Sequence, residues 1–350
     1  MAAIMVSEQR VVVVGVDTHS EVHVAVALSE LGERLSAISV PTTPGGFERL
    51  VRWAESLGEV RAFGIEGPGS FGATLARHLR DRGHGVLEVA RPDRRIRREE
   101  GKSDTIDAEA AARTLLSGTD VGEPKSADGC VEMIRSLRVA RRSAMKARTQ
   151  AANQLHALVI TCPEPLRSRL HRLPVGALAE LAARFRPGPM DSPQAASKLA
   201  LRHLARRHVA LGAEIADLDR ELDVLVARAA PGLVGMMGIG TDVAGALLVA
   251  AGDNPDRLGK EAAFARLCGA APLPASSGKT NRHRLSRGGD RIANNALWRI
   301  VLVRMRYDER TRTYVERRTK EGLSKKEIIR CLRRYVARDV YHRLEGVDSL

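Results

Sequence analysis

The sequence is poor in aromatic residues, cysteines and long apolar runs, and each shortage excludes a class of protein. Aromatic residues are 3% of the 350, so base stacking on an aromatic platform is not the expected mode of nucleic-acid binding. The four cysteines are scattered, with no CxxC spacing, which indicates reduced thiols rather than a disulfide framework or a zinc site. No apolar run approaches the roughly 20 residues that span a bilayer, and the N-terminus lacks a signal-peptide pattern. We therefore expect a cytoplasmic protein with no membrane partner.

Acidic residues are also few relative to basic ones. Lysine and arginine number 56 and aspartate and glutamate 42, a formal net charge of +14. This excess favours a polyanionic partner, nucleic acid rather than a membrane surface. The length allows two or three domains, and we divide the chain into residues 1–125, 126–230 and 231–350.

Residues 10–118 are predicted to form an α/β unit with an acidic residue at the end of two strands. The apolar run 11–16 ends at Asp17, and the mostly apolar run 60–65 ends at Glu66. Such runs are typical of central strands that are buried on both faces. Ligands bind at the carboxyl edge of open α/β sheets, although a single acidic residue there is more often an ordinary solvated turn residue.

A further pair of acidic residues begins a predicted helix. Ser103 is a helix-capping residue type, and Asp104 and Asp107 are three residues apart, on one helix face. They either complement the helix dipole or bind a divalent cation. Together with Asp17 and Glu66 they form a set of four carboxylates. Such a set can hold two Mg²⁺ ions roughly 4 Å apart, the arrangement that supports in-line attack on phosphodiesters.

Two basic stretches are candidates for contact with nucleic-acid backbones, or are simply solvated charged faces. The first contains Arg94, Arg95, Arg97, Arg98 and Lys102, and the second contains Lys279, Arg282, Arg284, Arg287 and Arg291. The second stretch also includes Ser276 and Ser277. A serine surrounded by cations can attack phosphorus, but serines in such a loop also form ordinary turns.

The middle and the C-terminal part are predicted to be helical. Residues 131–158 form one long helical pattern. Leucines at 204, 211, 218 and 225 form a heptad seam that predicts coiled-coil pairing, either with the first helix or with another subunit. Residues 237–244 resemble a helix-hairpin-helix turn, whose amides bind phosphate, or are a plain turn. Residues 324–327 form a capping box ahead of a C-terminal helix.

Several motifs resemble those of a known family. They are GVDTH with Asp17, GIEGPGS with Glu66, KSDTIDAEAAAR with Asp104 and Asp107, then GIGTDVAGALLVAAG, LCGAAPLPASSGK and RLSRGGDRIANNAL. In this order they resemble the DEDD transposases of bacterial insertion sequences, of the insertion-sequence one-ten group, which are similar also to the pilin-gene invertases.

The resemblance implies a fold and a mechanism. It implies a RuvC-like (RNase H fold) N-terminal domain that binds Mg²⁺ through Asp17, Glu66, Asp104 and Asp107. A helical coiled-coil segment and a mostly helical C-terminal transposase domain would follow. The family's nucleophile stands just before the glycine, which corresponds to Ser277. Members cleave and rejoin double-stranded DNA through a phosphoserine linkage, guided by a bridge RNA that pairs with donor and target. A homo-oligomer, dimer or tetramer, is expected at the bacterial nucleoid.

Two other functions fit the same residues. A RuvC-like structure-selective endonuclease, such as a junction resolvase, would use water as the nucleophile, and Ser277 would only contact phosphate. A non-catalytic nucleic-acid-binding protein would use the basic loop and the hairpin-like turn. Four clustered carboxylates disfavour a passive binder, because they repel phosphate.

Overall fold

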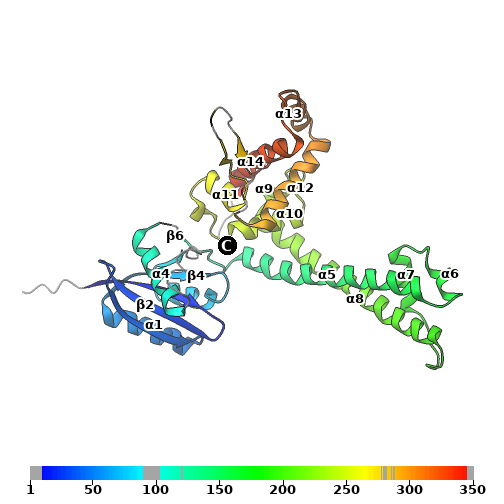
Figure 1. The fold of residues 1–350 in the computed structure, drawn as a ribbon, viewed down its shortest axis with the longest axis horizontal. Helices are drawn as coiled ribbons and strands as arrows, with labels where there is room; N and C mark the ends of the chain where they lie inside the picture. The colour runs from blue at the N-terminus through cyan, green and yellow to red at the C-terminus, as the bar shows by residue number, and fades with distance from the viewer. Residues whose placement is uncertain are drawn as a thin grey trace, which may run out of the picture. The chain divides into compact units, whose positions relative to one another are not determined.

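The computed structural model describes residues 10–89, 103–119, 121–276, 278, 282–284, 286 and 288–344. The chain divides into two compact units, Met1–Ala127 and Asp128–Leu350 (Figure 1). The first unit is mixed α/β, and the second is mostly helical. This agrees with the predicted fold class at the level of α/β plus α, while the division into three domains stays a prediction.

The first unit is built on a six-stranded sheet of order β3-β2-β1-β4-β5-β6. Its strands are β1 (Val11–Thr18), β2 (Val22–Ser29), β3 (Arg34–Pro41), β4 (Glu59–Glu66), β5 (Val86–Val89) and β6 (Val121–Gly122). β1, β2 and β3 are antiparallel neighbours, and β1, β4 and β5 are parallel. The two strands predicted from the apolar runs 11–16 and 60–65 are confirmed as β1 and β4. β6 was not predicted, because two residues are too few to show a periodic pattern.

Helices pack on both faces of this sheet. α1 (Pro44–Leu57) and α2 (Ala73–Asp81) share one hydrophobic core with Val14 and Val16 of β1. α4 (Asp104–Ser117) shares another with Val13 of the same strand. Adjacent residues of β1 are therefore buried on opposite sides, as its all-apolar sequence predicts. α2 begins at Ala73, after a turn formed by residues 67–70 in which Gly67 has φ +68°.

The second unit begins with two long helices that pack along each other. These are α5 (Cys130–Thr161) and α8 (Pro193–Ala229), and Figure 1 shows them side by side. Nδ1 of the buried His208 on α8 lies 3.3 Å from the carbonyl oxygen of Arg148 on α5. α8 therefore packs on a helix of the same chain, while coiled-coil pairing through the leucine seam stays a prediction.

The rest of the second unit consists of shorter elements. They are α6 (Leu166–Leu170), α7 (Val175–Ala183), α9 (Pro231–Val234), α10 (Thr241–Ala251), the 3-10 helix η1 (Pro255–Leu258), α11 (Glu261–Leu267), the β-hairpin β7 (Leu273–Pro274) and β8 (His283–Arg284), α12 (Arg291–Tyr307), α13 (Glu309–Lys320) and α14 (Lys325–Leu344). One hydrophobic core joins α10, α12 and α14. None of the helices in the described part of the chain combines the length and the apolar character needed to cross a membrane.

The predicted capping box ahead of α14 is confirmed. The Ser324 hydroxyl donates to Oε2 of Glu327 at 2.6 Å, and the same carboxylate oxygen accepts from the Ser324 backbone amide at 3.0 Å. The first turn of α14 is therefore closed by its own side chains.

Candidate metal centre

The two strand-end carboxylates lie side by side. β1 and β4 are parallel neighbours in which Val16 is opposite Ile65, so Asp17 and Glu66 follow at the same level of the sheet. Side chains alternate between the faces of a strand. Val13 and Ala62 both belong to the core under α4. Asp17 and Glu66 each lie four residues further along the same strand, an even spacing, so their side chains are on the face that α4 covers.

A pair of glycines lets α4 approach these strands closely. Gly15 of β1 is opposite Gly64 of β4. A Cβ atom added at Gly15 would lie 2.1 Å from the carbonyl oxygen of Ala108, and one at Gly64 would lie 3.3 Å from that of Ala111. The side-chain-free sheet surface and the alanine-rich helix face together allow a backbone-to-backbone contact. This packing carries the first turn of α4 to the ends of β1 and β4.

The first turn of α4 supplies the second pair of carboxylates. The Ser103 side chain accepts a hydrogen bond from the Ile106 amide at 3.2 Å, so the predicted cap is confirmed. Asp104 is the first helical residue, and its side chain is 53% exposed. Asp107, one turn further, is buried at 5% exposure. Asp107 therefore faces the protein interior, and Asp104 borders solvent.

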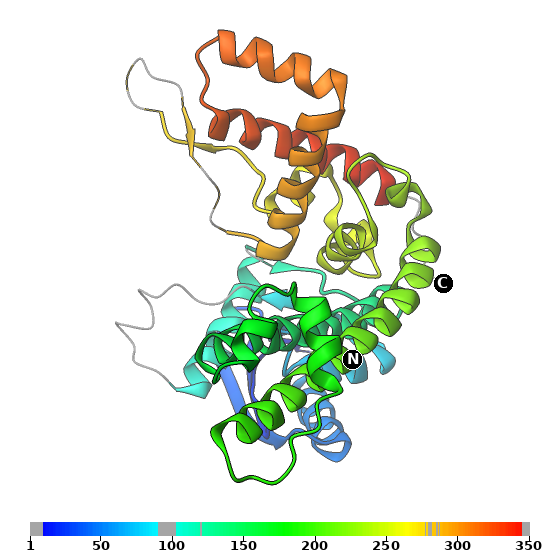
Figure 2. The same ribbon diagram turned by 90° about the vertical axis from the view of Figure 1, so that its right-hand side faces the viewer.

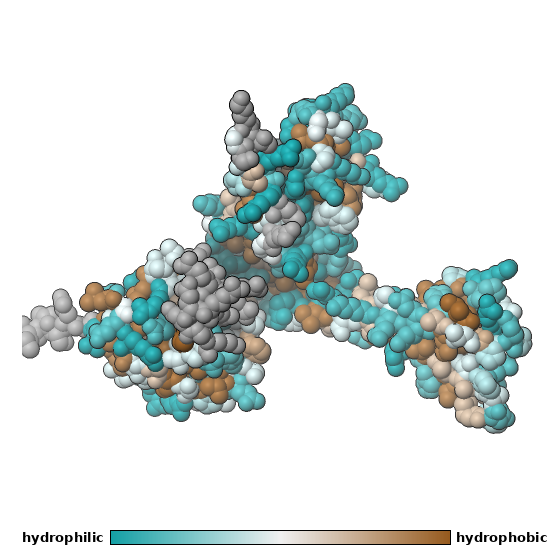
Figure 3. All heavy atoms as spheres, viewed as in Figure 1, coloured by the Kyte–Doolittle hydropathy of each residue, from teal (hydrophilic) through white to brown (hydrophobic). Residues whose placement is uncertain are grey.

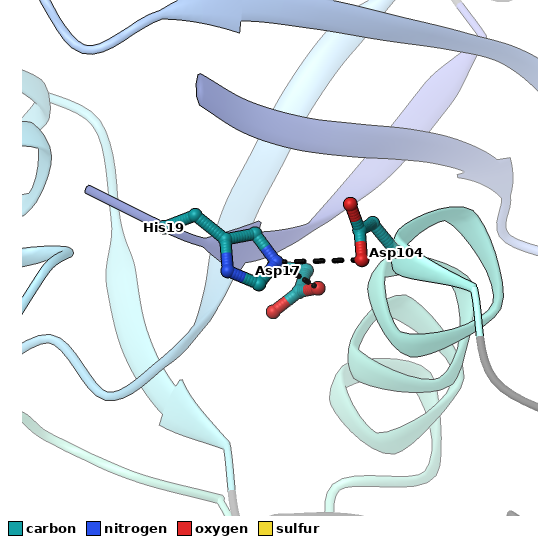
Figure 4. Close-up of side chains that lie close together, drawn as sticks. All are labelled: Asp17, His19 and Asp104. Atoms are coloured by element: carbon teal, nitrogen blue, oxygen red, sulfur yellow. Dashed lines mark hydrogen bonds and ion pairs between the residues drawn. The ribbon is translucent and has the colours of Figure 1, made fainter. Parts of the chain in front are cut away.

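A histidine that the sequence analysis did not single out completes the group. His19 follows β1, and its Nε2 lies 3.1 Å from Oδ2 of Asp17 and 3.5 Å from Oδ1 of Asp104. Figure 4 shows the imidazole directed at both carboxylates. One ligand atom from each of these three residues lies within 4.8 Å of the other two. The signal was present in GVDTH, where the histidine stands two residues after Asp17.

The electrostatics of Asp17 show that like charges are concentrated here. Burial raises the pKa of Asp17, the carboxylates of Asp107 and Glu66 raise it further, and His19 opposes the change. Asp17 is thus a buried acid that interacts with two other acids. Carboxylate oxygens are the ligands that Mg²⁺ prefers, and a bound cation would relieve their mutual repulsion. The residues present fit a divalent metal ion.

A second histidine lies behind the first. His23 on β2 is fully buried, its ring stacks on Phe47 with centroids 5.8 Å apart, and its Nδ1 accepts a hydrogen bond of 3.4 Å from the His19 amide. Burial lowers the pKa of His23, and the charge of His19 lowers it further. His23 therefore packs under the His19 backbone in surroundings that disfavour its charged form.

The other predicted site residues belong to different parts of the chain. Arg282, Arg284 and Arg291 are exposed residues of the second unit. Ser276 is exposed too, and its Oγ accepts a hydrogen bond of 3.3 Å from the Arg282 amide. The remaining predicted residues lie outside the described residues: Arg94, Arg95, Arg97, Arg98, Lys102, Ser277, Lys279 and Arg287.

Comparison with known families decides the class of protein. A family model for IS110-type DEDD transposases matches residues 14–162, which include all four carboxylates. A second model, Transposase IS116/IS110/IS902 family, matches residues 232–316, which include the serine loop. The chain belongs to the IS110 family of DEDD transposases. It is thus a DNA transposase, an enzyme that binds, cleaves and rejoins DNA. A comparison with curated proteins finds no match.

In this transposase, the turn that resembles a helix-hairpin-helix is occupied by the protein's own side chains. Asp242, in the first turn of α10, pairs with Arg138 of α5 at 2.9 Å and with Arg299 of α12 at 2.5 Å. Arg141 lies 3.6 Å from the same carboxylate. The carboxylate at this position, already paired with arginines, connects α10 to α5 and α12. These contacts support the plain-turn interpretation.

Proposed function

We propose that this transposase exchanges DNA strands through a covalent phosphoserine intermediate, with Ser277 as the nucleophile and Mg²⁺ bound at the carboxylate cluster. The observation that carries the proposal is the buried Asp17 among other acids. A protein that only binds nucleic acid has no use for such a concentration of negative charge.

Four residues would hold the metal: Asp17, Glu66, Asp104 and Asp107. Bound Mg²⁺ supplies Lewis-acid stabilisation of the charge that develops on phosphate and on the leaving oxygen. The chain's own part is to present the oxygens in advance. β1 and β4 fix Asp17 and Glu66, the packing of α4 fixes Asp107, and the His19 imidazole, 3.1 Å from Asp17, steadies that carboxylate.

The covalent step conserves the energy of the phosphodiester bond. The Ser277 oxygen attacks phosphorus and forms an O–P bond, and the bond to the 3′ oxygen breaks. The hydroxyl loses its proton, and the departing 3′ oxygen takes one up from solvent. Attack by the 3′ hydroxyl of another strand reverses these steps and releases the serine, so no ATP is required. Arg284 on β8, and Arg282 just before that strand, would stabilise the oxyanion.

Several finer points belong to the same proposal. We propose a RuvC-like (RNase H type) fold for the first unit, supported by acids at the ends of adjacent parallel strands. The domain limits remain residues 1–125, 126–230 and 231–350. A bridge RNA would select the sites, which is compatible with a low aromatic content. A dimer or tetramer would assemble on DNA in the cytoplasm.

A covalent adduct tests this mechanism. The protein, with its bridge RNA and Mg²⁺, is incubated with duplex DNA that carries the element's ends and is labelled at the 3′ termini. A labelled protein band on a denaturing gel is expected. Ser277→Ala should abolish this band, whereas the adjacent Ser276→Ala, a matched control, should retain it.

Other outcomes would identify the competing functions. Cleavage without an adduct, unchanged in Ser277→Ala, would identify an endonuclease that uses water. Binding without cleavage at any Mg²⁺ concentration would identify a passive nucleic-acid-binding protein. An adduct that forms in EDTA would contradict the metal requirement, and one that forms without RNA would contradict guidance.

A further inference from the structure

The second unit contains a pocket with a strongly basic lining. Its volume is about 550 Å³, within the range of about 300–1,000 Å³ that is typical of ligand sites. Among the described residues, its lining includes six arginines and one acidic residue, Glu327. The arginines come from the β7–β8 hairpin, α13 and α14: Arg282, Arg284, Arg318, Arg330, Arg333 and Arg334. Figure 2 shows this hairpin beside the beginning of α14.

Arg333 differs from its neighbours in having a neutral partner. Arg334 pairs with Glu261 at 2.8 Å, and Arg330 lies 3.8 Å from Glu327. In the described part of the chain, the hydrogen bond of the Arg333 guanidinium is to Oδ1 of Asn294, at 2.7 Å, and its buried Nε has no hydrogen-bond partner. A partly buried charge without a counter-charge is unfavourable. Burial, together with Arg330, accordingly lowers the pKa of Arg333.

Asn294 holds Arg333 in place without neutralising it. The Asn294 amide nitrogen donates to the carbonyl oxygens of Cys268 and Gly269, at 2.8 and 3.0 Å. This fixes the amide orientation, so Oδ1 faces Arg333. The same contacts tie down Gly269, at the edge of the pocket. The guanidinium is therefore positioned in advance while its positive charge stays available.

We infer that this pocket binds a phosphate group of a nucleic-acid backbone, with Arg333 as its central contact and Arg330 and Arg282 beside it. The planar guanidinium donates two parallel hydrogen bonds to a phosphate. The inference rests on the proposed function, because the hairpin that forms one wall also carries the serine loop. DNA and RNA present the same phosphodiester, and the experiment separates them.

Salt-dependent binding measures the contact directly. The affinity of the full chain for a labelled 30-base-pair DNA and for an RNA of equal length is measured between 50 and 300 mM NaCl. Each phosphate contact contributes about 0.9 to the slope of log K against log salt for duplex DNA, and about 0.7 for single strands. Arg333→Gln should make this dependence less steep by the amount of roughly one phosphate contact. It should also weaken binding at least about tenfold at 100 mM salt.

Three further variants distinguish a specific phosphate site from a general effect of positive charge. Arg220→Gln on α8, where the side chain is 70% exposed and pairs with Asp217, removes the same charge and should leave the slope unchanged. Arg330→Gln should lower the slope even if Arg333→Gln does not fold. Arg333→Lys keeps the charge but not the planar fork, so it should recover the slope and only part of the affinity.

The outcomes distinguish a failure of this inference from a failure of the proposed function on which it rests. A reduced slope with DNA, RNA or both supports the pocket and identifies the polymer. If the wild type binds normally and the slopes of Arg333→Gln and Arg330→Gln equal that of Arg220→Gln, the phosphate site in the pocket is refuted and the proposed function is not. A wild-type protein that binds neither polymer would overturn the proposed function as well.

Discussion

Gly15→Ala should disable the metal centre without touching a carboxylate. The added Cβ would lie 2.1 Å from the carbonyl oxygen of Ala108 and 2.2 Å from the amide nitrogen of Ala112. An ordinary carbon–oxygen contact is about 3.3 Å, so α4 must retreat by roughly 1.2 Å. Because Asp104 and Asp107 belong to the same helix, they would move with it.

Gly15→Ala should reduce both the stability of the protein and the rate of DNA cleavage. Overpacking a core by one methyl group destabilises a protein by about 1–3 kcal/mol. A displacement of about 1 Å at a reacting centre lowers a rate by about 100-fold. In Gly64→Ala the added Cβ would lie 3.3 Å from the nearest atom of α4. This variant should therefore reduce stability and cleavage rate less than Gly15→Ala. The measurements are thermal unfolding and the rate of Mg²⁺-dependent DNA cleavage.

A matched glycine provides the control. Gly45 lies in the first turn of α1, and a Cβ there would have no atom within 4 Å. Gly45→Ala should leave cleavage unchanged and should stabilise the protein by about 0.4–1 kcal/mol, because the unfolded chain becomes less flexible. If Gly15→Ala cleaved DNA as fast as Gly45→Ala, the glycine-dependent packing of α4 would not position the site.

Three further predictions concern charge and capping. Asp17→Asn should abolish cleavage. Without metal it should leave the free energy of unfolding unchanged or increase it, because the raised pKa of Asp17 means that its charge opposes folding. Mg²⁺ should raise the melting temperature of the wild type only. Burial raises the pKa of Asp242, but its arginine partners lower it more. Their stabilisation is therefore present above about pH 4 and is lost as pH falls through the lower folded pKa. Asp242→Asn should remove this dependence and about 1–3 kcal/mol at pH 7, as measured by urea unfolding. Ser324→Ala should destabilise α14 by about 1 kcal/mol, measured by the same method.

Local patterns in the sequence predicted much of the first unit. An apolar run that ends at an acid identified β1 and β4, and Ser103 identified the beginning of α4. These signals are local, because a buried strand and a helix cap depend on residues that are adjacent in the chain. The rule for sheet edges predicted that Asp17 and Glu66 lie near each other, while the addition of the Asp104 and Asp107 pair depended on the family resemblance.

The features that the sequence did not predict depend on contacts between distant residues. Gly15 and Gly64 look like ordinary glycines until the register pairs them under α4. Asn294 and Arg333 are separated by 39 residues, and each is unremarkable alone. The sequence does contain a signal for His19, because residues 17 and 19 of an extended segment point to the same side. This spacing would have predicted that His19 lies near the Asp17 carboxylate.

The charge distribution of the chain links metal binding to DNA binding. The whole chain carries +14, yet the candidate metal centre gathers the carboxylates of Asp17, Asp104 and Asp107 with Glu66 nearby. A phosphate that approaches these acids is repelled unless a cation is present, while basic surfaces elsewhere still attract the polymer. Mg²⁺ should therefore affect the two events differently. Overall affinity should not rise with Mg²⁺, because the cation competes for backbone phosphates as other salts do. Entry of the scissile phosphate should nevertheless require Mg²⁺, and Asp17→Asn should weaken that requirement by removing a negative charge.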